Sequence, residues 1–280
     1  MTGWSRFDAW RRSVKAAAWR RAGRVPGATG HGAARWEAIE RALSGASAGS
    51  YGGEDAGIDE RVVEYAWLFE RMRALAAPNT RALDAGSVLN YPPVLAAWRR
   101  GNLPRVSIVT LTYEGFADPS DEVRYEFADL RELPYRDAWF STVLSLSTLE
   151  HVGLDNRIYG TAGAVAPNPG AEVARALTEL HRVTAHNGTL FVSVPYGVRS
   201  NRGWFRVFDA DDLARITGAP GWAGPRVRYF RQAREGWREG SADDVKTAGY
   251  NEPRNRPGQQ TAPVWVSGAE AVALIEMTRA

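Results

Sequence analysis

The hydrophobic positions of this 280-residue chain alternate between short apolar runs and longer amphipathic stretches. The runs at 82–85, 105–112, 124–128, 140–146 and 189–194 are short enough to be buried strands. Between them, 92–100 and 170–184 have apolar residues at helical spacing. Strands that alternate with helices in this way predict a parallel sheet covered on both faces.

The pattern continues toward the C-terminus. Residues 208–216 predict a helix that ends at Gly218, and 226–230 and 271–278 predict two more strands. The Pro- and Gly-rich stretch 251–263 between these strands is typical of a loop.

The first part of the chain has a different character. Residues 1–24 carry seven basic residues against one aspartate, a net charge of +6, and place Trp4, Phe7, Trp10 and Val14 on one face of a predicted helix. Such a helix could lie on an anionic membrane surface, or pack on its own domain or a partner. We therefore predict a basic helical extension over 1–43, a flexible Gly/Ser/Ala-rich linker over 44–58 and the main domain over 59–280, with Asp59 capping its first helix.

The amino-acid composition mainly excludes certain classes of site and protein. The chain has no cysteine, which excludes disulfides and thiolate metal sites. The start of the chain lacks a secretory h-region and no run of about 18 apolar residues occurs, so we expect a cytoplasmic protein. All of the excess positive charge lies in 1–24, so the overall net charge of +3 is no argument for nucleic-acid binding.

Small or acidic residues follow several of the predicted strands. Asp84, Glu114, Asp129 and Ser147 each stand at or just after a strand end. In a parallel α/β sheet, ligands bind in the crevice beyond the carboxyl ends of the strands, so these positions predict one site for a nucleoside-bearing cofactor.

Four sequence segments at these strand ends resemble the class I S-adenosylmethionine-dependent methyltransferases over residues 59–280. They are Leu83-Asp-Ala-Gly-Ser87, Phe127-Ala-Asp-Leu-Arg-Glu-Leu-Pro-Tyr135, Val143-Leu-Ser-Leu-Ser-Thr-Leu-Glu-His-Val152 and Leu180-His-Arg-Val-Thr-Ala-His-Asn-Gly-Thr-Leu-Phe-Val-Ser-Val-Pro195. The resemblance implies a Rossmann-like α/β fold with a seven-stranded, mostly parallel sheet whose last strand is antiparallel, and S-adenosyl-L-methionine as cofactor.

The resemblance also implies roles for individual residues. The loop Asp84, Ala85, Gly86 and Ser87 would meet the methionyl part of the cofactor, Glu114 the ribose hydroxyls, and Asp129 with the Leu130 amide the adenine. The family usually continues the first loop with Gly-x-Gly, but this chain has Val88, Leu89 and Asn90 there. The loop must therefore take another path, with Asn90 as the residue expected to supply the turn.

The end of the fourth strand would face the transferred methyl group. Ser147 is expected beside the cofactor and His151 is a candidate base, since imidazole can accept a hydroxyl proton at neutral pH. Two structural alternatives stay open: Ser147 and Glu150 match a helix-capping box, and His151 can be a hydrogen-bonded structural histidine. Relatives that hold a metal here carry another carboxylate at the position of Ser147, so we expect no metal.

We therefore expect methyl transfer to a small molecule or glycan, with oxygen as the favoured nucleophile. Nucleic acid is not an expected partner, because the Asn/Asp-Pro-Pro-Tyr motif of base-modifying relatives is absent after the fourth strand. Two alternatives remain: a cofactor-binding scaffold without catalysis, and a membrane- or partner-binding protein that acts through residues 1–24.

Overall fold

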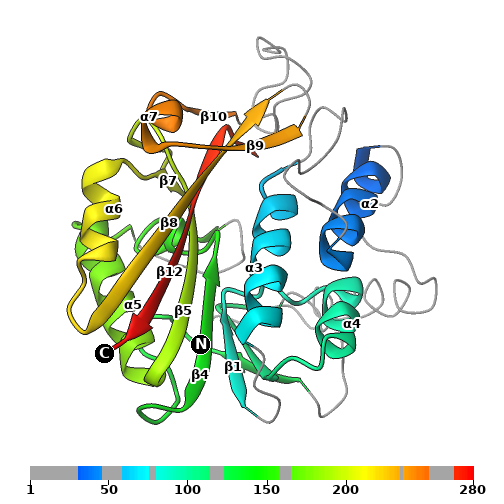
Figure 1. Ribbon diagram of the computed structural model, residues 1–280. Coiled ribbons are helices and arrows are strands. Elements are labelled where there is room, and N and C mark those ends of the chain that lie inside the picture. The colour runs from blue at the N-terminus through cyan, green and yellow to red at the C-terminus, as the bar shows by residue number, and fades with distance from the viewer. Residues whose placement is uncertain are drawn as a thin grey trace, which may run out of the picture.

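A single mixed sheet forms the centre of the molecule (Figure 1). The computed structural model describes residues 31–45, 59–75, 80–113, 123–157, 165–233, 236–251 and 268–280. Across the sheet the strands are β3 (Arg124–Phe127), β2 (Arg105–Thr110), β1 (Arg81–Ala85), β4 (Phe140–Leu146), β5 (Thr184–Pro195), β12 (Ala271–Arg279), β8 (Trp222–Ala233) and β9 (Gly236–Gly240).

The Rossmann-like α/β prediction is confirmed in its main features. Strands β3, β2, β1, β4 and β5 are parallel, and the last strand, β12, runs antiparallel to both β5 and β8. Beyond this sheet, β6 (Ser200–Asn201) pairs with β7 (Arg206–Val207), and β10 (Tyr250–Asn251) pairs with β11 (Gly268–Ala269).

The predicted number of strands was wrong, because the sheet has eight and not seven. The additional strand, β9, pairs antiparallel with β8 at the edge of the sheet. Its sequence Gly-Trp-Arg-Glu-Gly contains one apolar residue and therefore lacks the alternating pattern of a strand. Trp237 is fully buried and anchors this edge, a tertiary contact that a local pattern cannot show.

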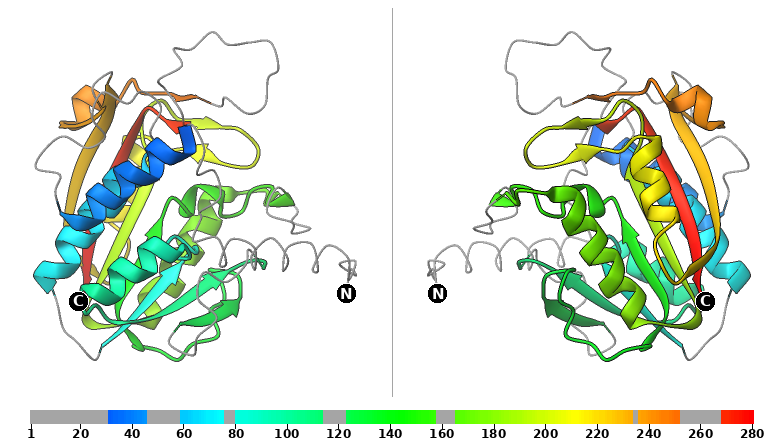
Figure 2. Two further views of the ribbon diagram at one scale, coloured as in Figure 1. Left: turned by 90° about the vertical axis from the view of Figure 1, so that its right-hand side faces the viewer. Right: turned by 90° about the vertical axis from the view of Figure 1, so that its left-hand side faces the viewer.

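Helices cover both faces of the sheet, as the side views in Figure 2 show. One layer contains α2 (His31–Ser44), α3 (Arg61–Leu75) and α4 (Pro92–Arg100), and the other contains α5 (Pro169–Val183) and α6 (Ala210–Thr217). Successive strand residues point to opposite faces, so Val272 and Leu274 of β12 pack in one hydrophobic cluster and Ala273 and Ile275 in the other. Two short elements complete the described chain, η1 (Leu149–His151) and α7 (Ala242–Val245).

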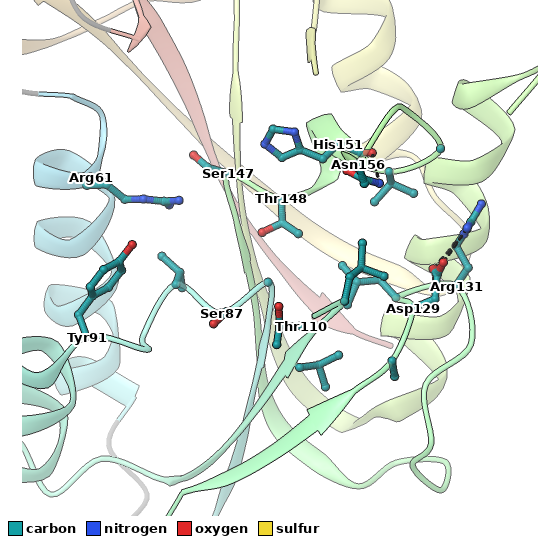
Figure 3. Close-up of a pocket in the computed structure, with 18 residues that line it drawn as sticks. Arg61, Ser87, Tyr91, Thr110, Asp129, Arg131, Ser147, Thr148, His151 and Asn156 are labelled. Carbon is teal, nitrogen blue, oxygen red and sulfur yellow. Dashed lines mark hydrogen bonds and ion pairs between the residues drawn. The ribbon is translucent and has the colours of Figure 1, made fainter. Parts of the chain in front are cut away.

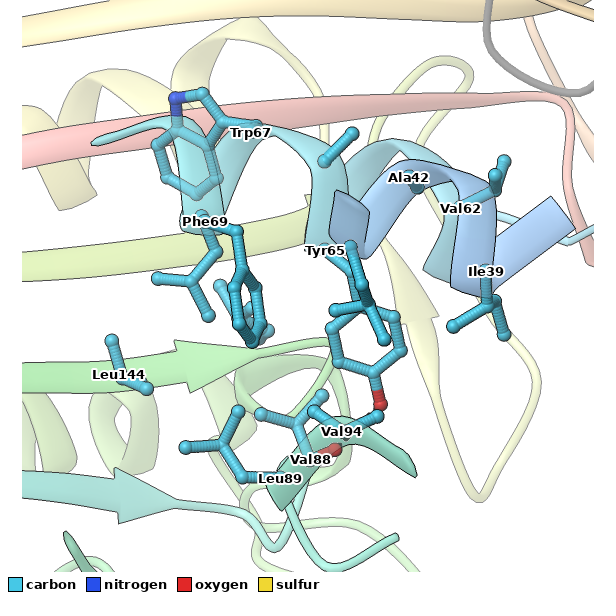
Figure 4. Packing of buried hydrophobic residues seen from close by; sticks show 14 of the residues in the cluster. Ile39, Ala42, Val62, Tyr65, Trp67, Phe69, Val88, Leu89, Val94 and Leu144 are labelled. Carbon is cyan, nitrogen blue, oxygen red and sulfur yellow. Dashed lines mark hydrogen bonds between the residues drawn. The ribbon is translucent and has the colours of Figure 1, made fainter. Parts of the chain in front are cut away.

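The helix α3 is buried on most of its surface because α2 packs on its outer side (Figure 4). Trp67 meets Phe191 of β5 edge to face, with ring centroids 5.3 Å apart. On the outer side, Ile39 and Ala42 of α2 join the same core. Asp59 caps α3 as predicted, with its Oδ1 3.3 Å from the Arg61 backbone nitrogen.

Several predictions about the first part of the chain fall outside the described residues. These are the basic helix over 1–24 and most of the linker over 44–58. The division into a 1–43 extension, a linker and a 59–280 domain therefore stays a prediction. Within the described part of the chain, no helix has the length and apolar character needed to span a bilayer.

Candidate functional site

A cavity of about 280 Å³ lies beyond the carboxyl ends of β1, β2, β3 and β4 (Figure 3). Six of the predicted site residues line it: Gly86, Ser87, Asp129, Leu130, Ser147 and His151. Parallel strands bring these ends together although the residues are far apart in the sequence. Glu114 lies outside the described residues, and its predicted ribose contact stays a prediction.

Asp84 and Ala85 lie beneath the cavity and do not line it. The Asp84 side chain is fully buried, and its two carboxylate oxygens accept the backbone N–H groups of Val88 (3.1 Å) and Leu89 (2.7 Å). This carboxylate shapes the loop after β1, and the predicted position of Asp84 beside the cofactor stays a prediction. Charged acceptors for backbone N–H groups make strong hydrogen bonds, so one residue can fix the whole loop.

The loop after β1 reaches its path without Gly-x-Gly. Gly86 has φ +135°, and a Cβ added there would lie 2.0 Å from Oγ1 of Thr148, so only glycine fits beside the end of β4. Ser87 has φ +66° and makes the turn that we expected from Asn90. Val88 turns into the core, where its carbonyl accepts the Tyr65 hydroxyl at 2.6 Å.

The end of β2 contributes Thr110 and Leu111 to the cavity. Ala85 pairs with Val109 in the register of β1 and β2, which sets Thr110 beside the glycine loop. The polar residue that the structure places at this strand end is therefore a threonine. Sequence reasoning passed over it because the strand was expected to continue to residue 112.

The end of β3 carries an ionised carboxylate. Burial by itself would raise the pKa of Asp129, but hydrogen bonds from the Arg131 side chain and backbone lower it below its usual value. Arg131 binds Asp129 through Nε (2.9 Å) and Nη2 (2.6 Å) and also bonds Glu172 of α5. Arg131 thus holds Asp129 at the edge of the cavity, where its carboxylate can accept hydrogen bonds.

Ser147 at the end of β4 does not form the capping box. The η1 helix begins after Thr148, which makes no side-chain capping bond. Instead Ser147, with φ +41°, donates its hydroxyl to Oε1 of Glu64 on α3, and Ser193 of β5 donates to the same oxygen. The other oxygen of Glu64 pairs with Arg61 at 2.7 Å, which ties α3 to the strand ends.

His151 is held as a neutral ring. Burial lowers its pKa to about 4, outweighing the opposite effect of its bond to the Trp204 carbonyl. Since a carbonyl oxygen only accepts, Nδ1, 2.9 Å from that oxygen, carries the proton and Nε2 is left as the acceptor of the ring. The ring also stacks on Trp204, with 5.3 Å between centroids and 19° between planes.

Sequence reasoning missed several residues that line the cavity, among them Arg61, Tyr91, Thr148 and Asn156. Arg61 is the first residue of α3 and lies across the cavity from Asp129 (Figure 3). An arginine at a helix start has no distinctive sequence signal. In the described part of the chain, no group of three or more His, Cys, Asp or Glu residues is arranged to hold a metal ion.

The lining suits S-adenosylmethionine in its chemistry. Arg61 offers a cation for a carboxylate, Asp129 and Thr110 offer oxygen acceptors, and Val109, Leu111, Ala128 and Val152 form apolar walls. The Ser87 hydroxyl is buried against the cavity and has no hydrogen-bond partner among the described residues. A buried orphan hydroxyl is costly unless a ligand satisfies it.

Comparison with known proteins gives one sequence match. Residues 113–192 match the sequence model of a methyltransferase domain. No curated protein has a sequence that matches this chain.

Three solved structures illustrate the similarity in fold. The 1,6-didemethyltoxoflavin-N1-methyltransferase of Burkholderia thailandensis, solved with S-adenosylhomocysteine, is 15% identical with a TM-score of 0.45, covering 100% of this chain and 91% of that chain. A chain from the complex of the Haloferax volcanii Trm112 methyltransferase activator is 13% identical with a TM-score of 0.47, covering 99% of both chains. An S-adenosylmethionine-dependent methyltransferase of Thermotoga maritima is 15% identical with a TM-score of 0.43, covering 75% of this chain and 87% of that chain.

The matched segment 113–192 contains Asp129, Ser147 and His151, so it includes the part of the cavity that β3, β4 and η1 build. The sheet topology and the glycine loop after β1 supply the rest of the site. The sequence match over 113–192, the sheet topology and the lining of the cavity together support a class I S-adenosylmethionine-dependent methyltransferase.

Proposed function

We propose that this methyltransferase acts on a hydroxyl group of a small molecule or glycan, with His151 as the proton acceptor. The single observation that carries the proposal is the position of His151, which lines both the cofactor cavity and a second, smaller cavity next to it. A group at this junction can reach a substrate and the cofactor at the same time.

The residues around the main cavity have distinct proposed roles in holding the cofactor. We assign the backbone of Gly86 and Ser87, together with Ser147, to the methionyl end, with Arg61 facing its carboxylate. Asp129 and the Leu130 amide are proposed for the adenine. When bound, S-adenosylmethionine supplies an activated methyl group, so the protein mainly needs to align the acceptor.

His151 accepts the hydroxyl proton at Nε2. Its lowered pKa keeps the ring neutral through the neutral pH range, and only a neutral imidazole can accept a proton. The carbonyl of Trp204 fixes the tautomer and the Trp204 ring fixes the plane of the imidazole. A fixed base contributes about 10²- to 10⁴-fold to such proton transfers.

Calorimetry and turnover test this proposal together. We expect S-adenosylhomocysteine to bind the full chain, and S-adenosylmethionine to be consumed with a pooled set of hydroxyl-bearing acceptors. His151→Gln should keep the S-adenosylhomocysteine affinity and lose about 10²-fold or more in kcat. The matched control is His186→Gln on β5, an exposed histidine outside the cavity. Absence of binding, or full turnover by His151→Gln, would refute the proposal.

Peripheral membrane contact through residues 1–24 and a cytoplasmic location are further parts of the proposal. The support is the charge of this segment, seven basic residues against one aspartate, and the apolar face that its sequence pattern predicts. Removing the segment and measuring binding to anionic vesicles at low and high salt tests it. Equal binding with and without residues 1–24 would contradict a membrane role.

A further inference from the structure

The second cavity lies beside the cofactor cavity and has a volume of about 160 Å³. Arg61, Ser147 and His151 line both spaces, so they separate the two. The remaining walls of the second cavity are two carboxylates and three aromatic rings: Glu60, Glu150, Trp204, Phe205 and Tyr250. The roles proposed above for the cofactor cavity involve none of these five residues.

Each of the two carboxylates has a buried oxygen that no described residue satisfies. Glu150 is 3% exposed, and its Oε2 is buried without a hydrogen-bond partner. Oε2 of Glu60 is likewise buried and unpartnered. Folded proteins satisfy nearly all such atoms, because a buried carboxylate without a partner costs free energy. Two of them in one small cavity therefore point to a ligand that completes the site.

No neighbouring cation forms an ion pair with either carboxylate, although the charge of Arg61 acts on both. Arg61 is already paired with Glu64 at 2.7 Å. Arg206 directs Nη2 to the carbonyl oxygens of Val152 and Pro169. His151 approaches Glu150 to 3.9 Å but is neutral, since burial holds its pKa at about 4. Among the described residues, no lysine or arginine lies within ion-pair distance of Glu60 or Glu150, and burial raises the pKa of both, that of Glu60 to about 8.

Aromatic faces form the rest of the cavity wall. Trp204 stacks on His151 and meets Phe205 with 4.5 Å between centroids, and Phe205 meets Tyr250 at 4.2 Å. The electron-rich faces of aromatic rings attract cations, and more strongly where water is excluded. Carboxylates and rings in one cavity share the same preference for positive charge.

We propose that the second cavity binds an ammonium group of the methyl acceptor, with Glu150 and Glu60 as its counter-ions. The acceptor is then an amine-bearing small molecule, such as an amino sugar or amino alcohol, whose hydroxyl lies toward His151. This assignment of substrate class rests on the proposed function, but the binding of a cation to the cavity can be measured without it.

The α-ammonium of the cofactor is the competing occupant, because it too is a cation and the two cavities adjoin. The two occupants make opposite predictions for a ternary complex. An acceptor ammonium binds when the cofactor cavity is filled, whereas the cofactor's own ammonium would displace any added amine.

Binding of cyclohexylammonium and of cyclohexanol to the full chain tests the proposal. The two probes have the same ring and differ in charge, and the amine is protonated at about pH 7.5. Saturation-transfer NMR and calorimetry would be carried out with and without saturating S-adenosylhomocysteine. We expect the cation to bind about tenfold or more tightly than the alcohol, under both conditions.

Glu150→Gln provides the matched variant, because it removes the acidic group that would ionise beside a bound ammonium and keeps the shape. It should abolish the preference for the cation while the circular dichroism spectrum and S-adenosylhomocysteine affinity stay unchanged. Glu239→Gln, in the β8–β9 hairpin and lining neither cavity, is the control and should keep the preference. If Glu150→Gln does not fold, Glu60→Gln replaces it, with a smaller loss expected.

Three results would overturn the proposal: equal affinity for the two probes, a preference for the cation that survives both glutamine substitutions, or displacement of the cation by S-adenosylhomocysteine. Different results would contradict the proposed function. These are the absence of S-adenosylhomocysteine binding, or turnover that does not depend on His151, irrespective of whether cyclohexylammonium binds.

Discussion

Oδ2 of Asp84 accepts the backbone N–H of Leu89 at 2.7 Å, five residues further along the chain. With the bond from Val88, it closes the loop after β1 around a fully buried carboxylate. The loop that family members build with three glycines is therefore built here with one glycine, a positive-φ serine and this carboxylate.

Asp84→Asn is expected to weaken the loop, because the amide keeps the shape but can accept at only one of its two ends. We expect a loss of about 1–3 kcal/mol in the free energy of unfolding and a weaker affinity for S-adenosylhomocysteine. Urea unfolding and calorimetry measure the two effects. Asp243→Asn on the exposed surface of α7 is the control, and equal losses in both variants would contradict the role of Asp84.

Gly86→Ala should be strongly unfavourable for two reasons. The added Cβ would lie 2.0 Å from Oγ1 of Thr148, and a φ of +135° strains any side-chain-bearing residue. We expect a loss of about 2–4 kcal/mol in unfolding free energy and loss of cofactor binding.

A double-mutant cycle separates the two causes. Adding Thr148→Ala to Gly86→Ala removes the Oγ1 and Cγ2 atoms that crowd the new Cβ. Part of the stability should return, and the backbone strain should remain. Strict additivity of the two substitutions would show that the close approach is not what selects glycine.

The free energy of unfolding should depend on pH through the raised pKa of Glu60. Burial first, then Asp59 and Glu64, raise its pKa to about 8, while Arg61 acts in the opposite direction. The folded state thus keeps a proton that the unfolded state has released once the pH exceeds the ordinary glutamate pKa of 4.5. Stability from this group is full below that value and is lost as pH rises through about 8.

Glu60→Gln should therefore flatten the curve of unfolding free energy against pH. We expect it to be more stable than the wild type by about 1–3 kcal/mol at about pH 8, and nearly equal to it at about pH 4. Urea titrations across this range give the difference directly. A constant difference at all pH values would mean that Glu60 titrates normally in the folded protein.

The pH profile of turnover should report on His151. A base must be neutral to accept a proton, and burial lowers the pKa of this ring to about 4. We expect kcat/KM to stay level as the pH falls through the ordinary histidine pKa of about 6.5, and to decline only near pH 4. A decline centred near the ordinary value would show that the ring is solvated or is not the base.

Much of the fold was predictable because it depends on local patterns. The bounds of β4 and α4 matched the predicted ranges. The β4 strand is a short, largely apolar run, and α4 begins at a proline, which favours the first turn of a helix. The β9 strand was not predicted because Trp237 is its only apolar residue. Its strand conformation follows from its pairing with β8, which the local sequence does not show.

The site was predictable in outline and not in detail. The strand ends pointed to Gly86, Asp129, Ser147 and His151 because a parallel sheet gathers its carboxyl ends at one edge. The capping-box alternative for Ser147 failed since its hydroxyl has a better partner in Glu64, more than eighty residues earlier in the chain.

The sequence by itself therefore determined the order of the elements, the class of fold and the strand tips that make the cavity. Those properties follow from periodicity and from residues next to one another in the chain. Only the tertiary structure decided that Asp84 supports the loop, that Arg61 faces the cavity and that Glu60 and Glu150 share a second one with aromatic rings. The reason is physical: burial, charge pairing and pKa depend on neighbours in space, which α3 and β10 bring to η1 from distant parts of the chain.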